Sequence, residues 1–408
     1  MKKYIYWAFC LPLLYGSCNE ETVGQYPIDS VPPGPVTNVQ VKEAFGGGAV
    51  ISYTIPEDLD LLGVKASYTL DTGEQVEVIA SAYNSEISVE GFAEVKEHPV
   101  TLRAIDKSRN ESKPVTIQVT PKRAPIFEVM ESLQIFNDFG GIQLQWQNPD
   151  QKDIIIIVSK PVPDSQLTES VQNIYSSAQD GIGYVRGFPA EPQTFIVEVQ
   201  DKWGNKTESK SQDCLPLYEE KVNSQKYWKR WNPADIPYDQ YPGNYGIEKI
   251  WDGKNMLSGS TNIYSSNRGV SMPFRITFDM QQVYKLSRLK LYQRTGSSYL
   301  YNQQSPKHFK IYGSLNRNVT LDATEPDRQW IELGEFESIK PSGLPLGKYS
   351  QEDLDWAGGG EEFTFPIQLA TPVRYIMLEF IENWGGVEGT AFSELEFWGS
   401  PEDNPAEN

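Results

Sequence analysis

The chain has 408 residues, a length typical of about two to four domains, and its 36 basic and 55 acidic side chains give a net charge of −19. This balance excludes the basic stripe of a nucleic-acid-binding protein and the polybasic patch of a protein that binds anionic membranes. Frequent Gly and Pro, and the lack of a long apolar stripe of helical period, indicate short strands joined by turns, so the sequence predicts an all-β protein.

Residues 1–17 have the features of an export signal. Two lysines precede a short apolar segment, residues 4–15, and two small residues stand directly before Cys18. The segment is too short to span a membrane as a helix. Small residues before a cysteine resemble a bacterial lipobox, and the acidic residues that follow resemble the export tag of surface lipoproteins of glycan-foraging Gram-negative gut bacteria. The resemblance implies lipidation of Cys18 and anchoring in the outer membrane; the alternative is an ordinary secretion signal with a chance cysteine.

Residues 18–35 read as a polar linker, and residues 36–121 as a first small β-sandwich. The strand candidates are residues 36–41, 49–53, 64–70, 75–79, 86–89, 99–106 and 115–120. Seven short strands at this spacing fit an immunoglobulin-like sandwich. The stretches PPGPVTNVQV and HPVTLRAIDKSRNES resemble a fibronectin type III domain.

Residues 122–216 repeat the first module. Residues 45–56 (FGGGAVISYTIP) align with residues 139–149 (FGGIQLQWQNP), and VTLRAIDKSRNES aligns with FIVEVQDKWGNKTE. In both modules an alternating strand ends in Asp-Lys and is followed by a turn that carries Asn. Trp146 occupies the position of a core Trp in such sandwiches, and Cys214, which has no partner for a disulfide, is expected to be a small buried side chain.

After a linker at residues 217–225, residues 226–400 form the third predicted domain. Its strand candidates are residues 288–294, 374–381 and 392–398, and a Lys-Ile-Trp-Asp-Gly motif begins at Lys249. This set resembles the discoidin, or factor V/VIII C-type, β-sandwich, a galactose-binding-like jelly roll that includes the family 32 carbohydrate-binding modules. The predicted architecture is therefore two fibronectin type III-like sandwiches followed by a discoidin-like sandwich, and the resemblance implies a binding protein.

The resemblance also implies a calcium site. Calcium binds about six to eight hard oxygens, and in the discoidin-like family an Asp-Gly loop near the start of the domain meets a Glu near its end. Asp252 and Glu394 match these positions, and Asn255, Ser260 and the carbonyl of Ala391 are candidates for further ligands. We therefore expect Ca²⁺ as a structural cofactor. The alternative is that the Asp-Gly pair is a common turn and Glu394 an ordinary strand residue.

The family 32 modules bind sugars through loops at one end of the sandwich. Such sites combine aromatic rings, which contact the apolar CH faces of sugars, with polar side chains that bond the hydroxyls. By position, Tyr264 resembles an aromatic residue of the family site and Arg294 resembles an Arg at the end of a strand. The loop after Arg294 offers Tyr299 and Tyr301, and the Gly-rich loop opposite offers Asn383 and Trp384. We expect Trp384 to stack on a sugar ring while Arg294 and Asn383 bond its hydroxyls. Alternatively, Tyr264 is a core aromatic and Arg294 pairs with a surface carboxylate.

Residues 340–362 form an insertion rich in Gly, Pro and acidic residues. Connections of this length without regular structure tend to be functional or disordered. Trp356, within the insertion, is a second candidate ligand contact.

Enzymatic function has little support. The two histidines, His98 and His308, fall in different predicted domains, and no serine has a nucleophile-elbow motif around it. The counts of His and Cys exclude a zinc site built from them. A carboxylate pair for glycoside hydrolysis could come from Asp353, Asp355, Glu361 or Glu362, although an acidic chain gives such pairs by chance. We expect no enzyme.

The sequence thus predicts a cell-surface lipoprotein that binds an oligosaccharide or polysaccharide without transforming it. It would pass the glycan to a neighbouring outer-membrane transporter or hydrolase of a polysaccharide-utilisation system. The first alternative is a scaffolding lipoprotein whose end loops bind a partner protein. The second is a glycan hydrolase with an unfamiliar carboxylate site.

Overall fold

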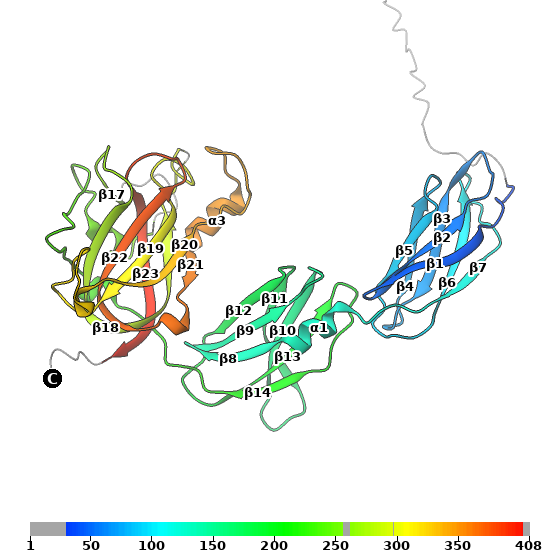
Figure 1. The fold of residues 1–408 in the computed structure, drawn as a ribbon, viewed down its shortest axis with the longest axis horizontal. Coiled ribbons are helices and arrows are strands. Elements are labelled where there is room, and N and C mark those ends of the chain that lie inside the picture. The colour runs from blue at the N-terminus through cyan, green and yellow to red at the C-terminus, as the bar shows by residue number, and fades with distance from the viewer. Residues whose placement is uncertain (1–29, 256–261, 297, 403–408) are drawn as a thin grey trace, which may run out of the picture. The chain divides into compact units, whose positions relative to one another are not determined.

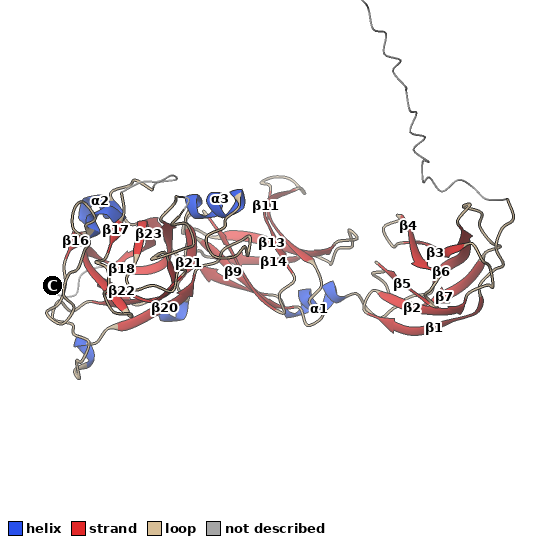
Figure 2. Ribbon diagram, turned by 90° about the horizontal axis from the view of Figure 1, so that it is seen from above, coloured by secondary structure: helices blue, strands red, loops and turns tan. Residues whose placement is uncertain are grey.

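In a computed structural model of the protein, the structure describes residues 30–255, 262–296 and 298–402 (Figure 1). Strands dominate this part of the chain, and its helices are short (Figure 2). By their internal contacts the residues form two compact units. Among the described residues, one unit runs from residue 30 to Val129 and includes Lys152–Ile154 and Val199–Thr207, and the other unit contains the remaining residues. No helix in the described ranges is both long and apolar enough to cross a bilayer. Cys18 lies outside those ranges.

The first module is a seven-strand sandwich, as predicted. One sheet has the order β1 (Thr37–Phe45), β2 (Gly48–Thr54), β5 (Glu86–Glu90). The other has the order β4 (Gln75–Ser81), β3 (Leu61–Thr69), β6 (His98–Asp106), β7 (Val115–Val119). Alternate residues of the strands, among them Ile51, Val64 and Leu102, are buried between the sheets, because successive side chains of a strand point to opposite faces.

The second module repeats this topology strand for strand after the helix α1 (Pro125–Ser132). One sheet has the order β8 (Gln134–Asp138), β9 (Gly141–Gln147), β12 (Asp180–Arg186). The other has the order β11 (Thr168–Ser176), β10 (Ile154–Pro161), β13 (Gln193–Asp201), β14 (Lys210–Cys214). Trp146 is buried, which confirms its predicted place in the core, and Cys214 is a buried free cysteine.

The Asp-Lys turns of the two modules have the same pattern of hydrogen bonds. The Asp106 carboxylate accepts from the backbone and side-chain N–H of Asn110 at 2.8 and 2.9 Å. In the second module, the Asp201 carboxylate accepts from the same groups of Asn205 at 3.0 and 2.9 Å. A hydroxyl two residues after each Asn, in Ser112 or Thr207, then accepts a backbone N–H of the preceding strand. The repeated sequence pattern therefore encodes a repeated turn.

We expect Asp106→Ala to lower the free energy of unfolding of the first module by about 1–3 kcal/mol, because the substitution removes a buried acceptor that holds two N–H groups of the partly buried Asn110. Hydrogen exchange of the β6 and β7 amides measures the change locally. Glu74→Ala, at an exposed position of the same module, is the control. Equal exchange rates in the two variants would contradict the role assigned to Asp106.

The C-terminal sandwich is built on one sheet with the strand order β15 (Glu220–Lys221), β23 (Ala391–Glu402), β18 (Phe274–Gln293), β22 (Pro372–Asn383), β19 (Pro306–Ser314), β20 (Ile331–Glu337). Three short strands join its sides: β16 (Lys229–Arg230) and β21 (Glu361–Thr364) pair with β18, and β17 (Tyr264–Ser265) pairs with β23.

The long strand β18 folds this sheet into two layers. Its first part, residues 274–279, pairs with β22, and its last part, residues 286–293, pairs with β23. The register shifts between these parts, where Gln281 has a φ of +62°. Such an irregularity bends a strand, so β18 passes from one layer to the other and closes the sandwich.

Aromatic rings fill the core between the layers. Phe278 of β18 lies 4.6 Å from the Trp228 ring, 5.5 Å from Trp251 and 6.3 Å from Phe397, measured between centroids. Trp251 ends the 3₁₀ helix η1 (Ile247–Trp251), so the Lys-Ile-Trp-Asp-Gly motif contributes a core side chain. Leu395 and Phe397 of the strand β23 are buried, and Glu394 is buried as well.

Two segments differ from the prediction. The expected linker at residues 217–225 contains β15, which pairs with β23, and the short helix α2 (Ser224–Tyr227). The insertion contains the helix α3 (Gln351–Gly359) rather than an irregular loop. Ser350 and Asp353 form a capping box at its start, with the Ser350 hydroxyl accepting from the Asp353 N–H at 3.2 Å.

Candidate functional site

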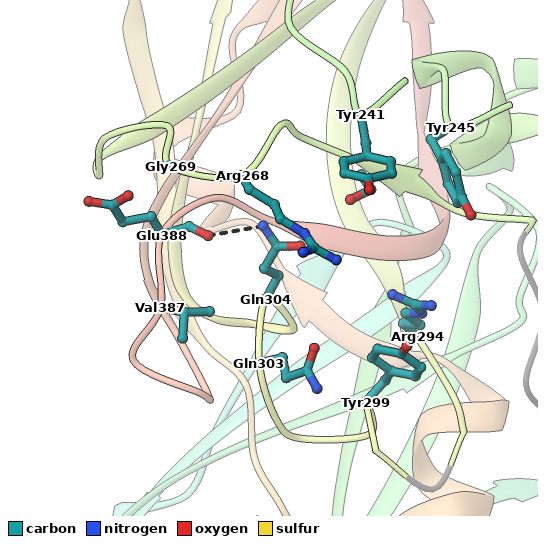
Figure 3. Close-up of a pocket in the computed structure, with 11 residues that line it drawn as sticks. Tyr241, Tyr245, Arg268, Gly269, Arg294, Tyr299, Gln303, Gln304, Val387 and Glu388 are labelled. Carbon is teal, nitrogen blue, oxygen red and sulfur yellow. Dashed lines mark hydrogen bonds between the residues drawn. The ribbon is translucent and has the colours of Figure 1, made fainter. Parts of the chain in front are cut away.

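The loops at one end of the C-terminal sandwich surround a cavity of about 670 Å³. Four segments contribute: residues 241–245, the turn after β17, the loop from β18 to β19 and the loop from β22 to β23. Both of these loops lie at one end because Gln293 pairs with Phe392 and Pro306 pairs with Asn383. The lining side chains are those of Tyr241, Tyr245, Ser265, Arg268, Arg294, Tyr299, Gln303, Gln304, Val387 and Glu388 (Figure 3).

Three tyrosine rings and two guanidinium groups line the cavity. The rings of Tyr241 and Tyr245 meet edge to face at a centroid distance of 5.6 Å. The Arg294 guanidinium carbon lies 3.4 Å from the centroid of the Tyr299 ring, and that of Arg268 lies 5.6 Å from the centroid of Tyr241. Figure 3 shows the side chains of Arg268, Arg294 and Tyr299 turned toward the same space. The surface thus offers apolar ring faces beside hydrogen-bond donors.

Asp239 positions the first wall of the cavity. Its carboxylate accepts from the backbone N–H of Asn267 at 2.7 Å and from the Asn267 side-chain amide at 2.8 Å. The buried Tyr264 hydroxyl donates to the Asp239 carbonyl at 2.7 Å, and the Tyr241 N–H donates to the Ser265 carbonyl at 2.7 Å. These bonds tie the segment that carries Tyr241 to the turn that carries Arg268.

The second wall depends on a close contact between two loops. The Gly385 N–H donates to the Gln303 carbonyl, the Trp384 N–H to the Ser305 carbonyl and the Ala391 N–H to the Gln304 carbonyl, each at 2.9 Å. A Cβ atom on Gly385 would lie 2.3 Å from backbone atoms of Gln303, so only glycine allows this approach.

Arg294 is held in an unusual environment. Burial lowers the pKa of its guanidinium, and the neighbours that oppose this effect are the hydroxyls of Tyr299 and Tyr245 rather than a carboxylate. Its Nε is buried and has no hydrogen-bond partner among the described residues. The group nevertheless stays charged at neutral pH, because arginine is not deprotonated in proteins.

Two of the predicted ligand contacts, Arg294 and Tyr299, line the cavity. Three others are corrected by the structure because they are buried: Tyr264 and Tyr301 at 0% exposure and Asn383 at 2%. Tyr301 donates to the Glu361 carboxylate at 3.3 Å. The Asn383 amide bonds backbone carbonyls of its own loop, including that of Gly389 at 3.0 Å.

Trp384 is partly buried and does not line this cavity, so its stacking on a sugar ring stays a prediction. Its ring meets Tyr301 edge to face at 5.4 Å, and its Nε1 donates to the Ser338 hydroxyl at 3.2 Å. Trp356 is 48% exposed on α3 and does not line the cavity.

Sequence reasoning missed the other nine lining residues, namely Tyr241, Tyr245, Ser265, Arg268, Gly269, Gln303, Gln304, Val387 and Glu388. The first two lie in an aromatic-rich stretch, residues 227–245, whose sequence suggests packing at the entry of the domain; Trp228 in this stretch is buried. The Pro-Gly pair after Tyr241 was an available signal, because such a pair marks an exposed turn.

The predicted calcium residues lie at the same end of the domain. The Glu394 Oε1 accepts from the Gly253 N–H at 3.0 Å, whereas its Oε2 is buried without a partner among the described residues. Burial and the nearby Asp252 raise the pKa of Glu394 to about 7. A buried, unpaired carboxylate oxygen beside a second carboxylate fits a cation.

The other candidate calcium ligands give less support to the predicted site. Asn255 is exposed, Ala391 is buried where β23 meets β17, and Ser260 lies outside the described residues. The described part of the chain contains no group of three or more His, Cys, Asp or Glu side chains arranged to hold a metal ion. Backbone carbonyls would therefore have to complete a site for Ca²⁺ around Asp252 and Glu394.

The carboxylates considered for hydrolysis do not meet in the cavity. Asp353 caps α3 and bonds Ser342 and Ser350, and Glu361 is buried. Glu388 is the single acidic side chain among the lining residues, whereas glycoside hydrolysis ordinarily uses two.

Comparison with known proteins assigns the family. Over 68% of this chain and 100% of the other, the sequence is 30% identical to the SusE-like protein BT2857, with a TM-score of 0.43. The chain belongs to the SusE-like proteins. Three domain families of unknown function also match it: DUF4959 over residues 33–121, DUF5126 over residues 122–225 and DUF5000 over residues 251–399.

Other solved structures resemble parts of this SusE-like protein at low identity. The C-terminal domain of a chitobiase from Bacteroides fragilis is 17% identical, with a TM-score of 0.30, over 45% of this chain and 100% of that one. A GH31 CBM32-2 module bound to GalNAc is 14% identical, with a TM-score of 0.27, over 42% of this chain and 95% of that one. None of the curated proteins matches the sequence.

Proposed function

We propose that this SusE-like protein is a cell-surface lipoprotein that binds glycans at the cavity of its C-terminal sandwich. The fibronectin type III-like modules act as spacers between a lipid on Cys18 and the binding domain. The bound glycan passes to a neighbouring outer-membrane transporter or hydrolase. The protein itself makes and breaks no covalent bond.

The observation that carries the proposal is the pairing of aromatic rings with amide and guanidinium groups around one cavity. The rings of Tyr241, Tyr245 and Tyr299 offer apolar surface to the CH faces of a sugar. Arg294, Gln303 and Gln304 offer hydrogen bonds to its hydroxyls. A volume of about 670 Å³ lies in the range typical of small-ligand sites.

The test is a glycan-array screen followed by calorimetry with the chain from residue 19 onward. Tyr245→Ala and Tyr299→Ala should each weaken binding by about tenfold, because each removes an aromatic contact. Tyr175→Ala, at an exposed site of the second module, is the matched control and should bind as the wild type does. A folded protein that binds no glycan, or binding that survives both cavity variants, would refute the proposal.

A partner protein is the second candidate ligand, because the insertion exposes apolar side chains. Leu344, Leu346 and Trp356 are 42–56% exposed, and Ile339, directly before the insertion, is 63% exposed. Contiguous exposed apolar surface is a feature of protein-binding sites. If the insertion binds a partner protein, the double variant Leu346→Ser/Trp356→Ser should abolish cross-linking to the cognate transporter and leave glycan binding unchanged.

We further propose a structural Ca²⁺ held by Asp252 and Glu394 with backbone carbonyls. A ligand that binds only the folded state stabilises it, by about 2.7 kcal/mol at one hundred times its dissociation constant. Addition of Ca²⁺ to chelator-treated protein should therefore raise the melting temperature by several degrees, and Glu394→Gln should remove the rise.

Calorimetric melting with Ca²⁺, Mg²⁺ and chelator provides the measurement. Glu388→Gln, which changes an exposed acid at the same end of the domain, is the control and should keep the Ca²⁺-dependent rise. Identical melting of the wild type with and without Ca²⁺ would show that Glu394 and Asp252 hold no calcium.

A further inference from the structure

The cavity is a locally cationic site in an acidic protein. Arg268 and Arg294 bring two positive charges to its lining and Glu388 one negative charge, whereas the whole chain has a net charge of −19. Glu388 is exposed, and the contact it makes with Gln304 uses its backbone carbonyl, at 3.0 Å. A neutral sugar does not require a local excess of positive charge, but an anionic ligand is attracted by it.

Arg294 differs from other partly buried arginines of the same sandwich. Arg374 donates to both oxygens of Asp279, at 2.8 and 3.1 Å. Arg288 donates to Glu219 at 3.0 Å. Each of these guanidinium groups is neutralised by a carboxylate, which is the usual condition for a charge withdrawn from water.

Arg294 has aromatic neighbours in place of a carboxylate. Tyr299 lies against one face of its guanidinium, and the Tyr245 hydroxyl acts on its charge. Within the described part of the chain its buried Nε lacks an acceptor. A partly buried guanidinium without a carboxylate lacks a counter-charge, and an anion bound in the cavity would supply one.

The aromatic contacts also fix the direction of the N–H groups. A guanidinium stacked on a ring keeps its N–H bonds in the plane parallel to that ring, so Arg294 presents a fixed fork of donors to the cavity. Arg268, which lies over the Tyr241 ring, adds a second set of N–H donors. Carboxylate and sulfate oxygens match this fork through two parallel hydrogen bonds.

We infer that the cavity selects an acidic glycan, whose carboxylate or sulfate group bonds Arg294 while its ring contacts the tyrosines. This inference rests on the proposed glycan-binding function and narrows it to a ligand class. Carboxylate and sulfate share the required chemistry, so the experiment contains an arm for each.

The test is calorimetry of the chain from residue 19 onward with two matched pairs of probes. The first pair is an oligogalacturonide and its carboxyl-reduced neutral form, and the second is a sulfated galactan oligosaccharide and its desulfated form. The acidic member of one pair should bind at least about tenfold more tightly than its neutral form, with an affinity that falls as salt is raised.

Three variants locate the effect. Arg294→Gln should remove the preference for the acidic probe, and Arg268→Gln should reduce it, because each takes away a guanidinium. Glu388→Gln should increase affinity for the acidic probe, since it removes the negative charge from the lining at an exposed position where folding does not depend on it. Thermal melting of each variant verifies that it is folded.

The outcomes separate this inference from the proposed function. Equal binding of acidic and neutral probes, lost in Tyr299→Ala, would overturn the inference and leave glycan binding intact. An acidic preference that persists in folded Arg294→Gln would also overturn it. Failure of the folded wild type to bind any probe or any arrayed glycan would overturn both.

Discussion

Replacing Gly385 with alanine is expected to weaken glycan binding by about tenfold or more and to destabilise the C-terminal sandwich by about 1–3 kcal/mol. The added Cβ would lie 2.3 Å from the backbone N and Cα of Gln303, which no side-chain rotation can relieve. The two loops must therefore separate and lose the hydrogen bond from the Gly385 N–H to the Gln303 carbonyl. Gln303 and Tyr299 share one of these loops, so the cavity wall moves with them.

Calorimetry of glycan binding and urea unfolding measure the two effects. Gly359→Ala is the matched control, because a Cβ atom there meets nothing within 4 Å and the residue lies in the helix α3, where alanine is favoured. That variant should bind normally and be at least as stable as the wild type. Normal binding by Gly385→Ala would mean that the loop contact does not shape the site.

Most of the fold was predictable because its signals are local. The seven strands of the first module follow from alternating apolar residues between turn residues, and the second module follows from its repeated Asp-Lys turn. The helix α3 was missed although Ser350 and Asp353 form a capping box, because the Gly and Pro residues around it indicated a loop. The pairing of β15 with β23 was missed because two residues are too few to show a period.

The site was only partly predictable because burial in loops depends on tertiary contacts. Trp384, flanked by Asn and two glycines, has the sequence surroundings of an exposed residue, yet it packs against Tyr301 across a loop contact that no local pattern encodes. Arg294 was predicted through its position in the resemblance and Tyr299 as part of the loop that follows it, and both line the cavity. Tyr241 and Tyr245 come from a segment far away in the sequence, which Asp239 holds in place.

The stability of the C-terminal sandwich is expected to fall as pH rises from 5 to 8, by as much as about 3 kcal/mol, through the titration of Glu361. Burial raises the pKa of this carboxyl from 4.5 to about 7, and bonds from Ser338 at 2.8 Å, Gln293 at 3.1 Å and the Ile339 N–H at 3.1 Å only partly oppose the effect. Between these pKa values the folded protein keeps a proton that the unfolded chain has released. The unfolded state then binds fewer protons, so the free energy of unfolding decreases as pH rises.

Glu361→Gln removes the titrating group, so its unfolding free energy should change less between pH 5 and 8 than that of the wild type. Urea unfolding at unit pH intervals, followed by tryptophan fluorescence, gives both profiles. Glu394, whose pKa is also raised, titrates in both proteins, and their difference therefore isolates Glu361. Glu352→Gln, at an exposed position of α3, should reproduce the wild-type profile. Parallel profiles for the wild type and Glu361→Gln would show that Glu361 ionises normally. A flatter profile in the variant would show that Glu361 is still protonated near neutral pH in the wild type. That proton would lie beside Tyr301, in the loop that forms the cavity wall.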